Sequence, residues 1–283
     1  MTTYHAITTS RISHRFAELK QAGELGMVAF ITAGDPTHED TRRIVLALAE
    51  AGADVIELGV PFSDPLADGP VIQRASERAL KSGTTLSGVL GMVRDLRATS
   101  EVPLVLFSYF NPILQMGLEK FAETAASVGA DGVLVTDLTP EESEEYRRIV
   151  RGRGLDTIFL AAPTSSDGRL RRIAQVSSGF LYLISRTGVT GESENLADEL
   201  PAVVRRVRAA TALPIAVGFG ISQPGHVSIL GGLADAAVVG SALVAEIARA
   251  HTVDAAASAV AARVRLLKAA AREGMSRRED SGV

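Results

Sequence analysis

The sequence predicts a single α/β domain built as a closed, parallel (β/α)8 TIM barrel. Short apolar runs alternate with amphipathic helical stretches, and eight such units can be counted along the 283 residues. The chain lacks a Gly-x-Gly-x-x-Gly fingerprint, which favours a closed barrel over the competing doubly wound open sheet. Since no linker, repeat or low-complexity tract divides it, we expect one domain over 1–283, with 274–283 as a frayed tail.

The expected strands share apolar, β-branched sequences, and each is followed by a helical pattern. They lie at residues 27–32, 54–60, 103–109, 132–136, 157–162, 180–185, 214–218 and 236–239. The first following helix, 37–51, places Ile44, Leu48 and Ala51 on one stripe and its charged residues on the other face. An extra N-terminal helix is expected at 10–20, where it would close the N-terminal end of the barrel, and an extra C-terminal helix at 254–273.

The composition excludes several classes of function. With 29 basic and 33 acidic residues and no basic run, the chain has no nucleic-acid signature. The absence of cysteine excludes disulfides and thiolate metal sites, and the five scattered histidines have no metal-ligand spacing, so no metal is expected. No secretory apolar stretch and no apolar run near the roughly 18 residues needed to span a bilayer is found, so we expect a cytoplasmic protein without a membrane partner.

Two carboxylates stand out in the segment 57–70 (ELGVPFSDPLADGP). Glu57 lies in a strand that is apolar on both sides, so an ionisable group is placed in the core, where burial is unfavourable unless the group is used. Asp68 follows on a stiff, proline-rich loop that can aim a side chain. The pair predicts an acid and a base, although Glu57 as a structural carboxylate and Asp68 as a turn residue remain the alternative.

The ends of the last three strands predict a phosphate site. Gly218 and Gly220 follow the seventh strand, and Gly240 and Ser241 open the helix after the eighth, where free N–H groups and the helix dipole favour an anion. A polar loop after the sixth strand could close as a lid, and its Gly191 could add another N–H. The alternative is that these glycines only form turns and Ser241 only caps its helix.

These motifs resemble the tryptophan synthase alpha subunit family along nearly the whole chain. The segment 57–70 is similar to the family signature, and 30–36 (FITAGDP), 109–112 (YFNP), 185–191 (SRTGVTG) and 218–222 (GFGIS) follow in family order. The resemblance implies a barrel that reversibly cleaves indole-3-glycerol phosphate to indole and glyceraldehyde 3-phosphate. It also implies Glu57 and Asp68 as the catalytic pair, and a phosphate site made by Gly191, Gly220, Gly240 and Ser241.

This chemistry suggests a role for each side chain. Glu57 would move the proton because burial raises its pKa, while Asp68 would stay ionised and bind the indole N–H. Tyr182 would hold the glycerol hydroxyls or Glu57, with plain packing as the alternative. The candidates for the indole pocket, each of which could instead be ordinary core, are Phe30, Phe107, Leu134, Thr190 and Phe219.

The resemblance also implies a partner, a pyridoxal-phosphate beta subunit in an alpha2beta2 tetramer, contacted around Pro61, Asp64 and Asn111. This chain itself has no site for that cofactor, so no cofactor is expected. A stand-alone lyase that releases indole, and a weakly active barrel that regulates a partner, remain alternatives from the sequence. Another phosphate-sugar barrel enzyme would have to reproduce the segment 57–70 by coincidence.

Overall fold

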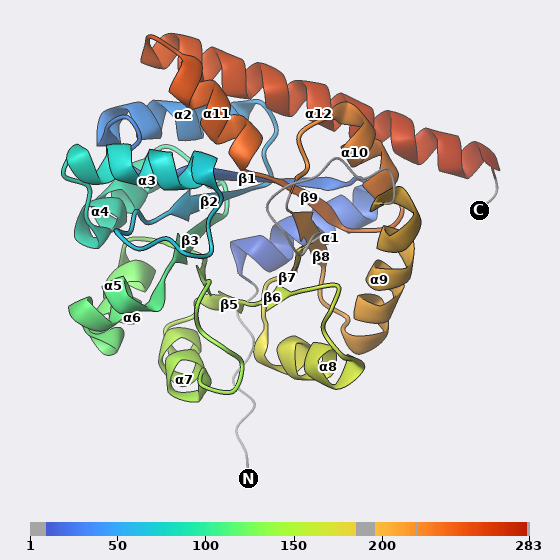
Figure 1. The fold of residues 1–283 in the computed structure, drawn as a ribbon, viewed down its shortest axis with the longest axis horizontal. Helices are drawn as coiled ribbons and strands as arrows, with labels where there is room; N and C mark the ends of the chain where they lie inside the picture. Colours follow the sequence, from blue (N-terminus) through green and yellow to red (C-terminus); the bar gives the residue numbers. More distant parts are fainter. Residues whose placement is uncertain (1–9, 185–195, 219, 282–283) are drawn as a thin grey trace.

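Parallel strands form a barrel surrounded by helices in the computed structural model, which describes residues 10–184, 196–218 and 220–281 (Figure 1). The strands are β1 (Gly26–Thr32), β2 (Val55–Gly59), β3 (Leu104–Ser108), β4 (Gly132–Val135), β5 (Asp156–Ile158), β6 (Leu160–Ala161), β7 (Leu181–Ile184), β8 (Ile215–Gly218) and β9 (Ala236–Val239). Their order in the sheet is β5-β4-β3-β2-β1-β9-β8-β7-β6. The predicted barrel is confirmed.

The fifth predicted strand is found in two pieces. β5 pairs with β4 and β6 pairs with β7, and only Phe159 separates the two pieces in the sequence. They are therefore two halves of one strand position, and the sheet closes into a barrel there. The break divides the predicted strand 157–162 without removing it from the barrel.

Helices cover the outside of the barrel. They are α1 (Arg11–Ala22), α2 (His38–Glu50), α3 (Pro70–Lys81), α4 (Leu86–Arg97), α5 (Phe110–Met116), α6 (Leu118–Ser127), α7 (Glu144–Gly152), α8 (Asp167–Val176), α9 (Leu196–Ala210), α10 (Pro224–Leu230), α11 (Ser241–Arg249) and α12 (Val253–Ser281). Both β2 and β3 are followed by two helices. α12 continues past the expected end at 273 and runs along α2, α10 and α11 (Figure 1). None of the described helices is long and apolar enough to cross a membrane.

The alternation of side chains along each strand builds two apolar regions. Ile56 and Leu58 of β2 face outward and belong to the core beneath the helices, together with Leu48 of α2. Val55 faces inward and belongs to a second core that fills the barrel. Each fully buried aliphatic side chain contributes about 1.5–3 kcal/mol. A strand buried on both faces must be apolar at every position, which makes Glu57 an exception in β2.

α1 closes the N-terminal end of the barrel, as the sequence predicts. Its N-cap Ser10 accepts the Ser13 N–H, and its apolar face, including Ile12 and Phe16, is buried in the inner core. The Phe16 ring lies 5.7 Å from the Phe180 ring, centroid to centroid. The inner core is therefore sealed from solvent at this end.

Three aspartates, each directly before a strand, bind neighbouring strands at this N-terminal end of the barrel. They are Asp54, Asp131 and Asp235. Each backbone N–H donates to the carbonyl of one residue near the start of a neighbouring strand, and each carboxylate accepts the N–H of that same residue. The strand residues bound in this way are Met27, Leu104 and Ile215, at N···O distances of 2.6, 2.8 and 2.7 Å to the carboxylates. Each carboxylate is also paired with at least one arginine. The aspartates thus fix strand register at the end where α1 sits.

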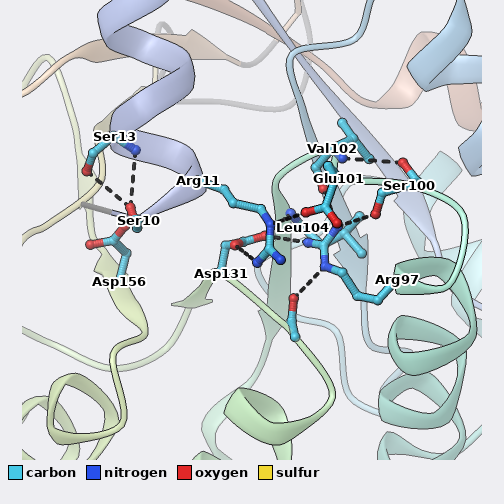
Figure 2. Close-up of polar contacts among 11 residues, drawn as sticks. Ser10, Arg11, Ser13, Arg97, Ser100, Glu101, Val102, Leu104, Asp131 and Asp156 are labelled. Atoms are coloured by element: carbon cyan, nitrogen blue, oxygen red, sulfur yellow. Dashed lines mark hydrogen bonds and ion pairs between the residues drawn. The ribbon is translucent and has the colours of Figure 1, made fainter. Parts of the chain in front are cut away.

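Polar side chains at the start of α1 join this arrangement (Figure 2). Arg11 lies 3.1 Å from Asp131, whose other oxygen binds Arg97, and Ser10 donates a hydrogen bond to Asp156. Arg97 is largely buried, since its side chain is only 10% exposed. α1 is therefore fastened to β4 and β5 by charge and hydrogen bonding as well as by apolar packing.

Candidate active site

The cavity at the C-terminal ends of the strands has a volume of about 420 Å³. It is lined by β1, β3, β6, β7 and β9, by the loops after β2, β4 and β8, and by the first residues of α3 and α11. The predicted site residues that line it are Phe30, Asp68, Phe107, Tyr182, Gly220, Gly240 and Ser241. A larger, more open groove of about 520 Å³ lies at the opposite end against α1, but it contains none of the predicted residues. We therefore place the site in the smaller cavity, where active sites of such barrels occur.

Glu57 lies inside the barrel, next to the cavity but outside its lining. Its register neighbours are Phe30 of β1 and Val105 of β3, and its side chain is 0% exposed. Neither carboxyl oxygen has a hydrogen-bond partner among the described residues. Burial without compensation raises the pKa of Glu57 to about 8, so the group carries its proton at neutral pH.

Asp68 lies at the mouth of the cavity on the loop between β2 and α3. Burial raises the pKa of Asp68 to about 6, although a hydrogen bond from Tyr109 opposes the rise. The side chain of Gln73 donates to the Asp68 carbonyl over 2.9 Å and fixes its backbone. At neutral pH Asp68 is mostly ionised while Glu57 is mostly protonated, so one acid and one base stand at the same site.

Tyr182 in β7 lines the cavity and also interacts electrostatically with the buried Glu57. Both burial and the charge of Glu57 raise the pKa of Tyr182. The ring packs against Gly218, where a Cβ would come within 2.3 Å of the tyrosine hydroxyl. Gly218 therefore makes room for Tyr182 and does not itself line the cavity.

Two phenylalanines form an apolar part of the cavity wall. The rings of Phe30 and Phe107 meet edge to face, with centroids 5.0 Å apart. Gly59 provides the space for Phe30, because a Cβ there would come within 2.6 Å of the ring. Leu134 is fully buried in the inner core and does not line the cavity.

The far end of the cavity can accept an anion. Gly240 is the N-cap of α11, no side chain caps this helix, and its first residues Ser241 and Ala242 face the cavity. Gly220 lines the same end with a φ of +83°, in the left-handed region that favours glycine. Free N–H groups at a helix start, with the positive end of the helix dipole, suit a phosphate.

Several predicted residues cannot be placed in the cavity. Thr190, Gly191 and Phe219 lie outside the described residues. Of the predicted contact residues for a partner, Asp64 and Asn111 are exposed and Pro61 is buried.

In the described parts of the chain, no three His, Asp or Glu side chains gather closely enough to hold a metal ion.

The structure adds residues that the sequence reasoning missed. Tyr109, at the end of β3, hydrogen-bonds Asp68, and Gln73 of α3 holds the same loop. Thr136, directly after β4, and Ser222, in the loop after β8, also line the cavity. A search for polar residues directly after strands would have identified Tyr109 and Thr136, whereas Ser222 lies further along the loop after β8.

Comparison with known proteins identifies the family. The family model described as tryptophan synthase alpha chain matches residues 16–272. The chain belongs to the tryptophan synthase alpha chain family. The alpha chain of Solibacter usitatus is 55% identical over 235 residues, which cover 83% of this chain and 88% of that one, and the alpha chain of Ralstonia nicotianae is 50% identical over 236 residues, covering 83% and 89%.

Solved structures of the tryptophan synthase alpha family agree with the fold. The alpha subunit from Legionella pneumophila has a TM-score of 0.86 at 39% identity and covers 93% of this chain and 99% of that chain. A Mycobacterium tuberculosis tryptophan synthase structure has a TM-score of 0.85 at 32% identity, with coverage of 93% and 99%. As an alpha chain, the protein is the carbon–carbon lyase subunit that cleaves indole-3-glycerol phosphate in tryptophan biosynthesis, and its partner is a beta subunit. These matches support this function over a stand-alone lyase or a regulatory barrel.

Proposed function

We propose that Glu57 and Asp68 divide the proton chemistry of this cleavage between them. The observation that carries the proposal is the difference in their surroundings. Glu57 is fully buried with no hydrogen-bond partner among the described residues, and its pKa is about 8, whereas Asp68 is half-buried, accepts a hydrogen bond, and has a pKa of about 6. Two carboxyl groups whose pKa values are pushed apart by their surroundings suit opposite roles in acid–base catalysis.

In the proposed mechanism, neutral Glu57 donates its proton to ring carbon C3 of the indole. The ring nitrogen then becomes positively charged, and the Asp68 carboxylate stabilises this charge by accepting the ring N–H. The Glu57 carboxylate next takes the proton of the side-chain hydroxyl, the bond between the ring and the glycerol chain breaks, and its electrons restore the aromatic ring. Indole and an aldehyde leave, and Glu57 is protonated again.

The mechanism requires Glu57 to reach the cavity. In the present conformation its register neighbour Phe30 lines the cavity but Glu57 does not. A rotation of the glutamate side chain past Phe30 would bring the proton to the substrate. Tyr182 would then bind the carboxyl group or the glycerol hydroxyls, a role supported by its position in the cavity lining and by the effect of the Glu57 charge on its pKa.

The substrate phosphate would bind at the other end of the cavity. Gly220, Gly240 and Ser241 line this end, and the uncapped start of α11 offers backbone N–H groups. Phe30 and Phe107 would then pack against the indole ring. Thr190, Gly191 and Phe219 remain predictions for the phosphate site and the indole pocket.

We place the beta-subunit contact on the loop after β2 and on α5. Asp64 and Asn111 are exposed there, and two large apolar side chains on the same segments are also exposed, Leu66 at 89% and Leu114 at 51%. A contiguous exposed apolar patch marks a protein interaction site, and we propose that Leu66 and Leu114 belong to one such patch. An alpha2beta2 tetramer and a cytoplasmic location belong to this proposal. Sedimentation of the mixed subunits would test the assembly, and Leu114→Asp should weaken it without changing the fold.

The test of the site is indole formation from indole-3-glycerol phosphate by the purified chain, with and without a beta subunit. We expect turnover that rises with the partner and that is mostly lost in both Glu57→Gln and Asp68→Asn, while both variants still bind substrate. Full turnover by either variant would refute the assigned roles.

A further inference from the structure

We propose that Tyr109 is a positioning residue of this site, whose hydroxyl orients the Asp68 carboxylate and holds the loop that carries it. The inference rests on the proposed role of Asp68, but the contact itself can be measured independently. Tyr109 comes from the end of β3, 41 residues from Asp68 in the sequence. Nothing in the proposed proton transfers uses it directly.

The hydrogen bonds around the Tyr109 hydroxyl have a fixed direction. The Ala67 N–H can only donate, and it lies 2.9 Å from the hydroxyl oxygen. The hydroxyl donates its own proton to the Asp68 Oδ2, 3.1 Å away, and a hydrogen bond with the Thr136 side chain, which lowers the pKa of Tyr109, fits Thr136 as a second donor to the phenol oxygen. An ionised carboxylate only accepts, so the arrangement favours the charged form of Asp68 and holds two consecutive loop residues at once.

Tyr109 is itself firmly held. Its side chain is only 5% exposed, and its ring lies 5.1 Å from the Phe62 ring, centroid to centroid. Its carbonyl accepts the Ser108 hydroxyl over 2.8 Å, and the following Phe110 N–H donates to Asp137 over 2.7 Å. A hydroxyl carried by such a rigid residue can orient a loop that would otherwise move.

The charges around Asp68 support this role. The Tyr109 hydrogen bond lowers the pKa of Asp68 against the effect of burial, whereas burial and the charge of Asp68 raise the pKa of Tyr109, so the phenol keeps its proton. Of the described residues that line the cavity, Tyr182 from β7 is the other titratable group, and Glu57 from β2 lies next to the cavity. Among the described residues, neither hydrogen-bonds Asp68.

Three variants separate the contact with the Asp68 carboxylate from a general loss of stability and from the anchoring of the loop backbone. The first is Tyr109→Phe, and the other two are controls. Tyr109→Phe keeps the ring and its packing but removes the hydroxyl. Tyr146→Phe removes the hydroxyl of another buried tyrosine, which lies 3.5 Å from the Val133 carbonyl and away from the cavity. Gln73→Leu removes the hydrogen bonds to the loop backbone and leaves the carboxylate contact intact.

Two measurements apply to all three variants in the full chain. The first is titration of the Asp68 carboxyl by ¹³C NMR of aspartate-labelled protein, assigned with Asp68→Asn. The second is the pH profile of kcat/KM for indole-3-glycerol phosphate. In Tyr109→Phe we expect the Asp68 pKa and the acidic limb to move up together by about one pH unit, with kcat roughly tenfold to a hundredfold lower. Tyr146→Phe and Gln73→Leu should leave the carboxyl titration unchanged.

The outcomes are distinguishable. An unchanged carboxyl titration in Tyr109→Phe would overturn the proposal, and so would an equal shift in Tyr146→Phe, because a general loss of stability would then explain both. If the titration shifts but the wild-type chain cleaves no indole-3-glycerol phosphate, the assigned function of the site fails and the Tyr109 contact stands.

Discussion

Replacing Glu57 by Gln should make the protein more stable while it abolishes most turnover. The pKa of Glu57 rises from 4.5 to about 8 on folding, and each pH unit between these values corresponds to about 1.36 kcal/mol. Because the unfolded chain releases this proton more readily than the folded protein does, Glu57 lowers the free energy of unfolding by about 3 kcal/mol at pH 7 and by roughly 5 kcal/mol above pH 8. Gln has nearly the same shape and no charge, and its unpaired amide replaces an equally unpaired carboxyl group, so most of this free energy should be recovered.

The sign follows from proton linkage. The folded state binds the Glu57 proton more tightly than the unfolded state, so this group lowers wild-type stability as the pH rises from about 4.5 to about 8. Below pH 4.5 the wild type and Glu57→Gln should be about equally stable. The advantage of the variant should then grow with pH and level off above pH 8.

Urea unfolding of both proteins between pH 4 and 9 measures this difference. Glu101→Gln is the matched control, because Glu101 is exposed and the ion pair with Arg11 lowers its pKa, so this change should give no growing advantage above pH 5. A difference between Glu57→Gln and the wild type that stays constant from pH 5 to pH 8.5 would refute the reasoning.

Four further predictions concern the cavity and the opposite rim. Asp68→Asn should lower kcat about a hundredfold or more with little change in KM, as measured by steady-state indole formation, and a change in KM alone would contradict its assigned role. Ser241→Asp should raise KM about tenfold by repelling the phosphate, and an unchanged KM would remove Ser241 from the phosphate site. The pH profile of kcat/KM should be bell-shaped, with an acidic limb near 6 where Asp68 loses its proton and an alkaline limb near 8 where Glu57 does. Asp131→Asn should lower the free energy of unfolding by about 3 kcal/mol, because it leaves the largely buried Arg97 without its charge partner, while the activity of the folded protein persists.

The strands could be predicted from the sequence because their signal is local. A short run that is apolar on both faces, such as the one around Ile56, is typical of a buried parallel strand. Glu57 could be identified because it is the ionisable residue within that run. The break at Phe159 has no such signal, since neither glycine nor proline interrupts 157–162. It arises where the barrel closes, which depends on the stagger of all the strands together.

The candidate site also contains some residues that local sequence predicts and others that depend on the three-dimensional arrangement of the barrel. Asp68, on the loop after β2, and Ser241, at the start of the helix after β9, could be predicted because every strand of a parallel barrel ends on the same face. Leu134 also faces inward, but its depth in the barrel depends on the stagger of the strands, and it lies below the cavity. The contact between Tyr109 and Asp68 depends on how the loop after β2 folds over the barrel, which no local pattern encodes.

The aspartates that precede β2, β4 and β9 have a consequence for how this barrel can change. They lock strand register at the rim opposite the cavity, through hydrogen bonds that involve none of the loops around the site. Mutations in those loops can therefore accumulate without loosening the strands beneath them. The chain can evolve new specificity at one end while the other end preserves its architecture, and a library of variant loops grafted onto this scaffold should retain the fold more often than one that alters the aspartate rim.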